Sequence, residues 1–167
     1  MRTKKHNLGV ITLGSSVRIS DPCYDMGVWC AKTLDNVLSG EYNAYTRVQD
    51  ENRYGRVTEL TVCHVNYKPK ALSKCNAYTC VGVDSGTCGI YDLDYYKKSH
   101  FENNIDDDWY SKNVCNGFWD KKSRGSNLDG LGVISTTGYG DGSYYVALEE
   151  NENGEIYRIT IQYLICD

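Results

Sequence analysis

Apolar and polar residues alternate over short stretches along most of this chain, a pattern typical of β-strands with one buried face. Residues 10–13 and 17–20 lie on either side of a glycine-serine turn and predict a strand, a turn and a strand. Residues 42–49 alternate strictly, with Tyr42 beginning the apolar face. A second β-rich run, residues 56–67, follows a polar loop, so the two runs together predict a hairpin.

The second half of the chain continues this pattern. Residues 80–83 and 89–91 form two short β-rich runs joined by the polar turn 84–87. The clearest hairpin lies at the end, where Asn153-Gly154 supplies turn residues that tolerate a positive φ. On its first strand one face carries Tyr144, Val146 and Leu148, and on its second strand one face carries Tyr157, Ile159, Ile161 and Tyr163.

Helical periodicity is scarce. We predict one short helix around residues 29–37, and a second that begins at the aspartates 106–108 and carries Trp109, because aspartate caps free N–H groups at helix starts. Residues 99–132 form a long polar insertion. The prediction is a mainly β (β-rich α+β) chain of 167 residues. It forms a single antiparallel sandwich- or barrel-like domain over 1–167, with one or two short helices.

Composition and charge narrow the partners. Fifteen tyrosines against two phenylalanines mean that many core rings carry a hydroxyl group that needs a hydrogen-bond partner. The net charge of −4 argues against a nucleic-acid binder that neutralises phosphates. We find no stretch that could span a membrane and no secretory signal, so we expect a cytoplasmic protein, or a protein of the host cytoplasm if a phage encodes it.

Eight cysteines without a Cys-x-x-Cys pair predict buried thiols rather than a disulfide framework, given the expected compartment. Two chemical alternatives remain open. A zinc ion could be held by Cys63, Cys75, Cys80 and Cys88, although their spacing is irregular for a zinc site. A nucleophilic pair of Cys23 and His64 would make the protein a thiol-dependent hydrolase or transferase. Our prediction includes no cofactor and no metal.

Several short segments resemble an uncharacterised bacterial and phage family, domain of unknown function 4241. The segments are Ser20-Asp21-Pro22-Cys23-Tyr24, Ser39-Gly40-Glu41-Tyr42, Gly55-Arg56-Val57, Val83-Asp84-Ser85-Gly86, Gly89-Ile90-Tyr91-Asp92 and Gly138-Tyr139-Gly140-Asp141-Gly142-Ser143-Tyr144. The resemblance covers most of the chain. It implies a β-rich fold and a bacterial or phage origin, and it implies no mechanism.

Polar turns are the candidate binding elements. The glycine-rich turn 138–142 offers unobstructed backbone N–H groups for an anion, or is simply a tight turn before a strand. Four aspartates near turns would form a ligand or cation site if they met at one rim, and otherwise bond nearby N–H groups. An acidic and aromatic segment near Trp109 could contact a partner. The candidate binding residues are Asp21, Cys23, Tyr24, Asp84, Asp92, Trp109, Tyr139 and Asp141.

The sequence therefore predicts a non-enzymatic binding protein that presents polar turns on a β scaffold to a host protein or a small molecule. A phage inhibitor of a host defence system is one alternative, resting on acidic charge and the family resemblance. Thiol chemistry at Cys23 is the other.

Overall fold

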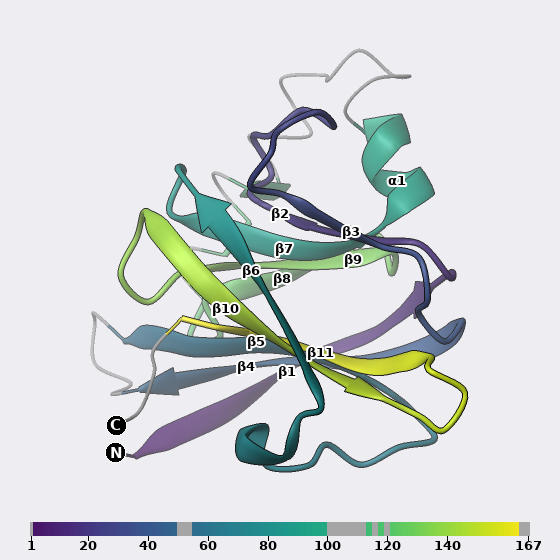
Figure 1. Ribbon diagram of the computed structural model, residues 1–167. Coiled ribbons are helices and arrows are strands. Elements are labelled where there is room, and N and C mark those ends of the chain that lie inside the picture. The colour runs from purple at the N-terminus through teal and green to yellow at the C-terminus, as the bar shows by residue number, and fades with distance from the viewer. Residues whose placement is uncertain (1, 50–54, 100–112, 115–116, 119–120, 164–167) are drawn as a thin grey trace.

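The computed structural model describes residues 2–49, 55–99, 113–114, 117–118 and 121–163, and within them two antiparallel sheets face each other as a sandwich (Figure 1). The larger sheet has the order β1 (Thr3–Leu13), β4 (Gly40–Gln49), β5 (Arg56–His64), β11 (Ile156–Gln162), β10 (Gly142–Glu150) and β6 (Ala77–Val83). The smaller sheet has the order β3 (Lys32–Leu34), β2 (Val17–Ser20), β7 (Thr87–Asp92), β9 (Gly132–Thr136) and β8 (Gly125–Leu128). The predicted fold class is confirmed.

The predicted strands are present, and their turns have two different roles. The β4–β5 and β10–β11 pairs are antiparallel hairpins within the larger sheet, as predicted. By contrast, the turns at residues 14–16 and 84–86 each carry the chain from the larger sheet to the smaller one. These two crossings help to hold the sheets face to face, because each joins strands of opposite layers.

The main core lies between the sheets and is built from the inward-facing residues of both. Its tyrosines follow the expectation that a buried hydroxyl needs a partner. Tyr42 donates to the carbonyl of Leu38 at 2.6 Å, and Tyr144 donates to the carbonyl of Gly140 at 2.7 Å. The hydroxyl of Tyr163 accepts a hydrogen bond from Ser135 at 3.1 Å. Polar ring tips are therefore accommodated without loss of hydrogen bonds.

A second apolar cluster covers the outer face of the smaller sheet. It joins Tyr91, Tyr96, Val114, Phe118, Leu128 and Ile134. Helix α1 (Leu93–Lys97) supplies Tyr96, and Asp92 caps this helix by accepting the backbone N–H groups of Asp94 and Tyr95. Under the helix, Arg18 is buried and stacks 5.0 Å from the Tyr96 ring. This face of the sandwich is thus closed by protein.

Three sequence predictions need correction or lie outside the described residues. The helix around 29–37 is wrong, because residues 32–34 pair with β2 as strand β3. The insertion 99–132 is not a loop throughout, since residues 125–128 form β8 and pair with β9. The helix at 106–108 and Trp109 lie outside the described residues. No described helix is long and apolar enough to cross a membrane.

Gly89 gives a test of the packing in the smaller sheet. A Cβ atom there would lie 2.4 Å from the Tyr91 ring and 2.6 Å from the carbonyl oxygen of Val133. We expect Gly89→Ala to lower the free energy of unfolding by about 2 kcal/mol, because overpacking a filled site forces the chain to shift. Urea denaturation measures it. Gly27→Ala, where a Cβ meets nothing within 4 Å, is the control, and equal midpoints for both variants would contradict the packing described.

Candidate functional site

Three of the four predicted turn aspartates gather at one end of the sandwich. Asp21 is buried, and its carboxylate accepts the backbone N–H groups of Cys23, Asp84 and Ser85 and the hydroxyl of Ser85. Asp141 directly precedes Gly142, which pairs with Val83 just before Asp84. The Asp21 carboxylate is therefore committed to holding the turn between β6 and β7, as turn-forming aspartates do.

Asp92 does not join this group. It lies at the other end of β7, where it caps α1 and accepts the backbone N–H of Gly14 at 2.9 Å. Its carboxylate thus links the start of the helix to the turn between β1 and β2. Asp92 therefore does not meet the condition for a site formed by all four aspartates, and it bonds nearby N–H groups as the alternative interpretation expects.

The aromatic candidates near the turns are placed by their neighbours. Tyr24 is half-buried, burial raises the pKa of its hydroxyl, and its backbone carbonyl accepts the hydroxyl of Tyr96. Tyr139 is 66% exposed, and the guanidinium of Arg56 lies 4.9 Å from its ring. Cys23 is exposed beside the same turn. These side chains remain candidates for contact with a partner at this end.

The geometry does not favour the two cysteine hypotheses. His64 ends β5 at the opposite end of the sandwich from the Asp21 turn that holds Cys23, so the two side chains do not meet. Cys88 is enclosed in the main core, whereas the thiols of Cys63, on β5, and Cys75 lie on the outer face of the larger sheet. Among the described residues, no group of three or more His, Cys, Asp or Glu side chains could hold a metal ion.

A different site lies on the outer face of the larger sheet. Residues 65–76, here called the covering segment, connect β5 to β6 and run across this face (Figure 1). The segment contains a short 3-10 helix, Leu72–Lys74, whose first carbonyl accepts the hydroxyl of Tyr78 at 2.8 Å. At Lys70, its backbone is held by side chains of the sheet: the N–H donates to a residue of β10, and the carbonyl accepts from a residue of β11.

A β-bulge places those side chains. Glu149 pairs with Arg158 and Glu150 pairs with Ile156, which leaves Tyr157 as an extra residue on β11. Ile156 stays in the main core, and Tyr157 turns to the outer face of the sheet. There both Tyr157 and Arg158 donate to the Glu149 carboxylate. The prediction that Tyr157 shares a face with Ile159 is therefore wrong, because a bulge interrupts the alternation of two residues per repeat.

Glu149 and Arg158 form an ion pair in which each side chain is only 2% exposed. Glu149 also accepts the Tyr157 hydroxyl at 2.6 Å and the Lys70 backbone N–H at 3.0 Å. Arg158 donates to the Lys70 carbonyl at 2.7 Å and to Thr160 at 3.0 Å, and Thr160 bonds to Thr61 at 2.8 Å. A buried pair with this many partners holds the covering segment in one position.

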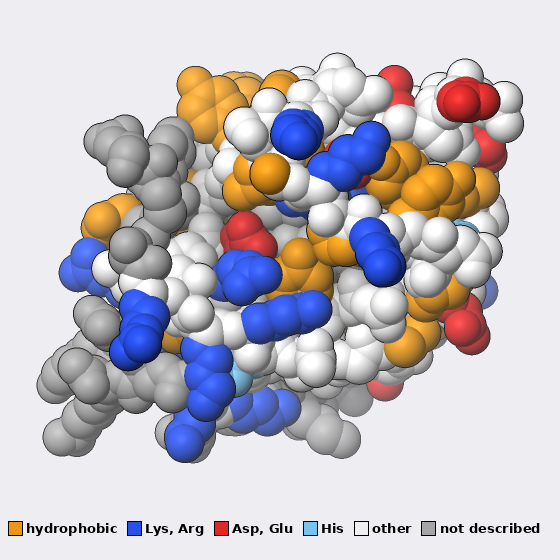
Figure 2. Space-filling view, turned by 90° about the horizontal axis from the view of Figure 1, so that it is seen from below, with side chains coloured by type: hydrophobic (Ala, Val, Ile, Leu, Met, Phe, Trp, Pro, Cys, Tyr) orange, Lys and Arg blue, Asp and Glu red, His pale blue; other side chains and the backbone are white. Residues whose placement is uncertain are grey.

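The covering segment leaves a pocket on each of its sides. The first, here called the basic pocket, has a volume of about 330 Å³ and is lined by Lys5, Tyr45, Arg47, Glu59, Pro69, Lys70, Ala71, Leu72 and Arg158. Its floor is Tyr45, with the Lys5 ammonium 4.3 Å from the ring and the Arg47 guanidinium 5.8 Å from it. Figure 2 shows Lys and Arg side chains gathered on this face.

One carboxylate, Glu59, lines the basic pocket. It accepts a hydrogen bond from the Nε–H group of Arg47, with an N–O distance of 3.1 Å. Burial raises the pKa of Glu59, and the charges of Arg47 and Arg158 offset only part of that effect. The pocket therefore combines four cationic side chains with a carboxyl group that takes up a proton more readily than an exposed glutamate.

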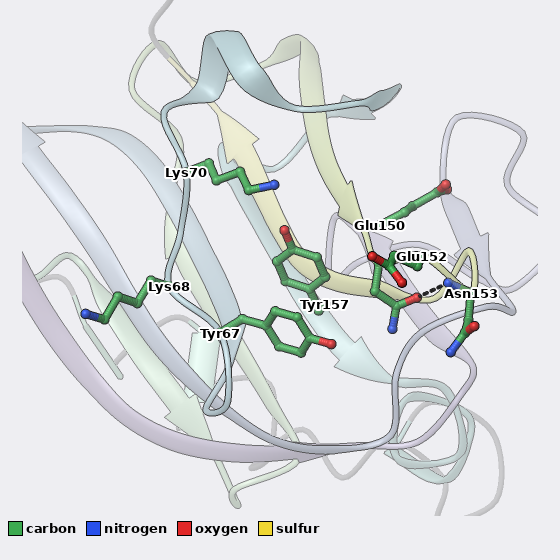
Figure 3. Close-up of a pocket in the computed structure, with 8 residues that line it drawn as sticks. Tyr67, Lys68, Lys70, Glu150, Glu152, Asn153 and Tyr157 are labelled. Atoms are coloured by element: carbon green, nitrogen blue, oxygen red, sulfur yellow. Dashed lines mark hydrogen bonds between the residues drawn. The ribbon is translucent and has the colours of Figure 1, made fainter.

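The second pocket, here called the tyrosine pocket, has a volume of about 480 Å³ and lies between the covering segment and the β10–β11 turn (Figure 3). Tyr67 and Tyr157 stack in it, with ring centroids 4.0 Å apart and planes at 14°. Its other lining residues are Lys68, Lys70, Glu150, Asn151, Glu152 and Asn153. Lys70 borders both pockets.

The two thiols near this site are not poised for nucleophilic chemistry. Burial raises the pKa of Cys63 to about 11, and it also raises the pKa of Cys75 above its ordinary value. A nucleophilic cysteine needs a lowered pKa, because the thiolate is the reactive species. The outer face is thus equipped for binding by charge, hydrogen bonds and aromatic rings.

Sequence reasoning missed this site although two signals pointed to it. Arg158 stands inside an otherwise apolar strand, and a charged residue there is buried only when it is paired. Lys68 and Lys70 lie on either side of Pro69, just beyond the strand that was predicted to reach residue 67 and in fact ends at His64. Neither signal reveals that Glu149 and Lys70 meet, because this depends on the register of the strands.

Comparisons with family models, with curated proteins and with solved structures find no match for this chain. The membership in domain of unknown function 4241 therefore stays a prediction. The function has to be inferred from the chemistry of the site described above.

The buried pair predicts a dependence of stability on pH. Burial alone raises the pKa of Glu149, but hydrogen bonds from Tyr157, Arg158 and the Lys70 backbone outweigh it, so the net pKa lies below the usual 4.5. A carboxylate with a lowered folded-state pKa stabilises the fold above about pH 4.5 and loses this contribution as the pH falls further.

We expect Glu149→Gln to lower the free energy of unfolding at neutral pH by about 3 kcal/mol, because Arg158 then remains buried without a counter-charge. The stability of this variant should also decrease less than that of the unchanged protein below about pH 4.5, because glutamine takes up no proton. Urea denaturation at a series of pH values measures both effects. Glu41→Gln, at an exposed position of β4, is the control, and equal stability of the two variants would contradict the role of the pair.

Proposed function

We propose that this protein is a non-enzymatic binding protein that takes a small anionic molecule into the basic pocket. One observation carries the proposal: four cationic side chains line a single pocket in a protein whose net charge is −4. Positive charge concentrated against the overall balance attracts anions to that place. The volume of about 330 Å³ lies within the range of small-ligand pockets.

The charges in the pocket have distinct tasks. Arg158 is balanced by Glu149 and Arg47 by Glu59, whereas Lys5 and Lys70 add positive charge to the lining. Both lysines are exposed, and they come from β1 and the covering segment. An anion between them would accept charge-assisted hydrogen bonds from both. A phosphate, sulfate or carboxylate group has this chemistry.

Binding is favoured over thiol-dependent catalysis. Cys23 and His64 lie at opposite ends of the sandwich, and the thiols of Cys63 and Cys75 on the outer face have raised pKa values. The polar turns at Asp84 and Asp141 stay available for contact with a further partner, since both aspartates are exposed. Inhibition of a host defence system remains a prediction from the family resemblance, and capture of a small anionic signal is one way in which such an inhibitor could act.

Neutralising the two lysines tests the proposal. We expect Lys5→Gln and Lys70→Gln each to weaken the binding of inorganic sulfate about tenfold, because each removes a charge-assisted bond worth roughly 1.4 kcal/mol. Isothermal titration calorimetry at low ionic strength measures the affinity. Lys97→Gln, on α1 outside the smaller sheet, is the matched control and should bind as the unchanged protein does. Equal affinities for all four proteins, or no sulfate binding at all, would refute the proposal.

Glu59 makes the binding dependent on pH. Its pKa is raised by burial, so on acidification it becomes neutral before an ordinary glutamate does. Sulfate keeps its charge over the same range, and we therefore expect its affinity to increase as the pH falls through the pKa of Glu59. Glu59→Gln should bind more tightly at neutral pH and show a flat profile. A profile that is unchanged in this variant would assign the pH dependence to another group.

A further inference from the structure

The tyrosine pocket differs from the basic pocket in charge. The two lysines and two glutamates among its lining residues, Lys68, Lys70, Glu150 and Glu152, cancel formally. A charged ligand would therefore gain little from this lining, whereas an uncharged ligand with many hydrogen-bonding groups would find both donors and acceptors. The two pockets of the outer face thus differ in the class of ligand that each would admit.

An aromatic platform forms one wall of this pocket. Tyr67 stacks on Tyr157, whose hydroxyl is fixed by Glu149, and the His64 ring lies nearly perpendicular to the Tyr67 ring at a centroid distance of 5.9 Å. Tyr67 itself remains 37% exposed, so part of this residue is accessible from solvent. A ring that is held on one face and partly open to water offers apolar area at little cost in conformational entropy.

The polar wall opposite the covering segment is also fixed. The Asn151 side chain accepts the backbone N–H groups of Asn153 and Glu155 and donates to the Glu155 carboxylate at 3.2 Å. These bonds hold the β10–β11 turn, which carries Glu152 and Asn153. Figure 3 shows Lys70 and Glu152 directed toward the tyrosine pair from opposite sides. Donors and acceptors are thus set around the edge of an aromatic face.

From this arrangement we propose that the tyrosine pocket binds a neutral saccharide. A sugar ring has one face of C–H groups that packs on an aromatic ring, and hydroxyl groups around its edge that both donate and accept hydrogen bonds. Carboxylates accept from such hydroxyls, an ammonium group donates to them, and an amide such as Asn153 does both. The volume of about 480 Å³ suits a small organic ligand. The proposal concerns a different pocket from the anion site and does not rest on it.

A panel of immobilised neutral mono- and oligosaccharides, probed with the full chain, tests the proposal. We expect binding to at least one neutral saccharide, about tenfold weaker binding for Tyr67→Ala, and retention within about threefold for Tyr67→Phe, which keeps the ring. Glu152→Gln should weaken binding as well. Because Glu152 is exposed, its substitution tests the site without changing the packing of the core. Tyr145→Ala, at an exposed tyrosine of β10 that lines neither pocket, is the control.

The outcomes separate this proposal from the anion site. Lys5→Gln should keep saccharide binding and lose sulfate affinity, whereas Tyr67→Ala should show the reverse. The urea midpoint of each variant reports whether it is folded. Absence of binding to every neutral saccharide, or equal binding by the unchanged protein, Tyr67→Ala and Glu152→Gln, would overturn the saccharide proposal. Binding to sulfated or carboxylated saccharides that is lost only in Lys5→Gln would overturn it too, and would assign the sugar to the basic pocket.

Discussion

Glu149 and Arg158 bring opposite charges together on the outside of the larger sheet, beneath residues 65–76. Neither charge has enough contact with water to be stable alone, so each depends on the other and on the backbone of Lys70. This requirement fixes the covering segment against the sheet. Both pockets exist because that segment stands there: one opens toward β1 and β4, and the other toward the β10–β11 turn.

The fold could be predicted to the extent that it depends on alternation and turn chemistry. The β4–β5 and β10–β11 hairpins were readable because an alternating face and a turn fix their register together. Strand β3 was not, because residues 32–34 become a strand only through pairing with β2. The same holds for β8, whose polar residues are ordered by β9 and by contact with β1. The local sequence pattern carries no information about pairing between such distant segments.

The site was less predictable than the fold for a related reason. The sequence left open whether the turns of Asp21 and Asp84 meet; they do, and the Asp21 carboxylate accepts backbone N–H groups of the second turn. The residues of the two pockets come from β1, β4, β5, the covering segment and the last hairpin, and are brought together by strand order alone. A charge inside an apolar strand, such as Arg158, marks a buried pair without naming its partner.

Because of the bulge at Tyr157, strand β11 contributes side chains both to the main core and to the site on the outer face. Ile159 and Ile161 keep their places between the sheets whatever residue occupies the extra position, while Tyr157 and Arg158 face the covering segment. Changes at the extra position therefore reach the outer pockets without disturbing the register of the main core. Over evolutionary time, such an arrangement allows the ligand preference of the outer face to diverge between related chains while the sandwich beneath it is conserved.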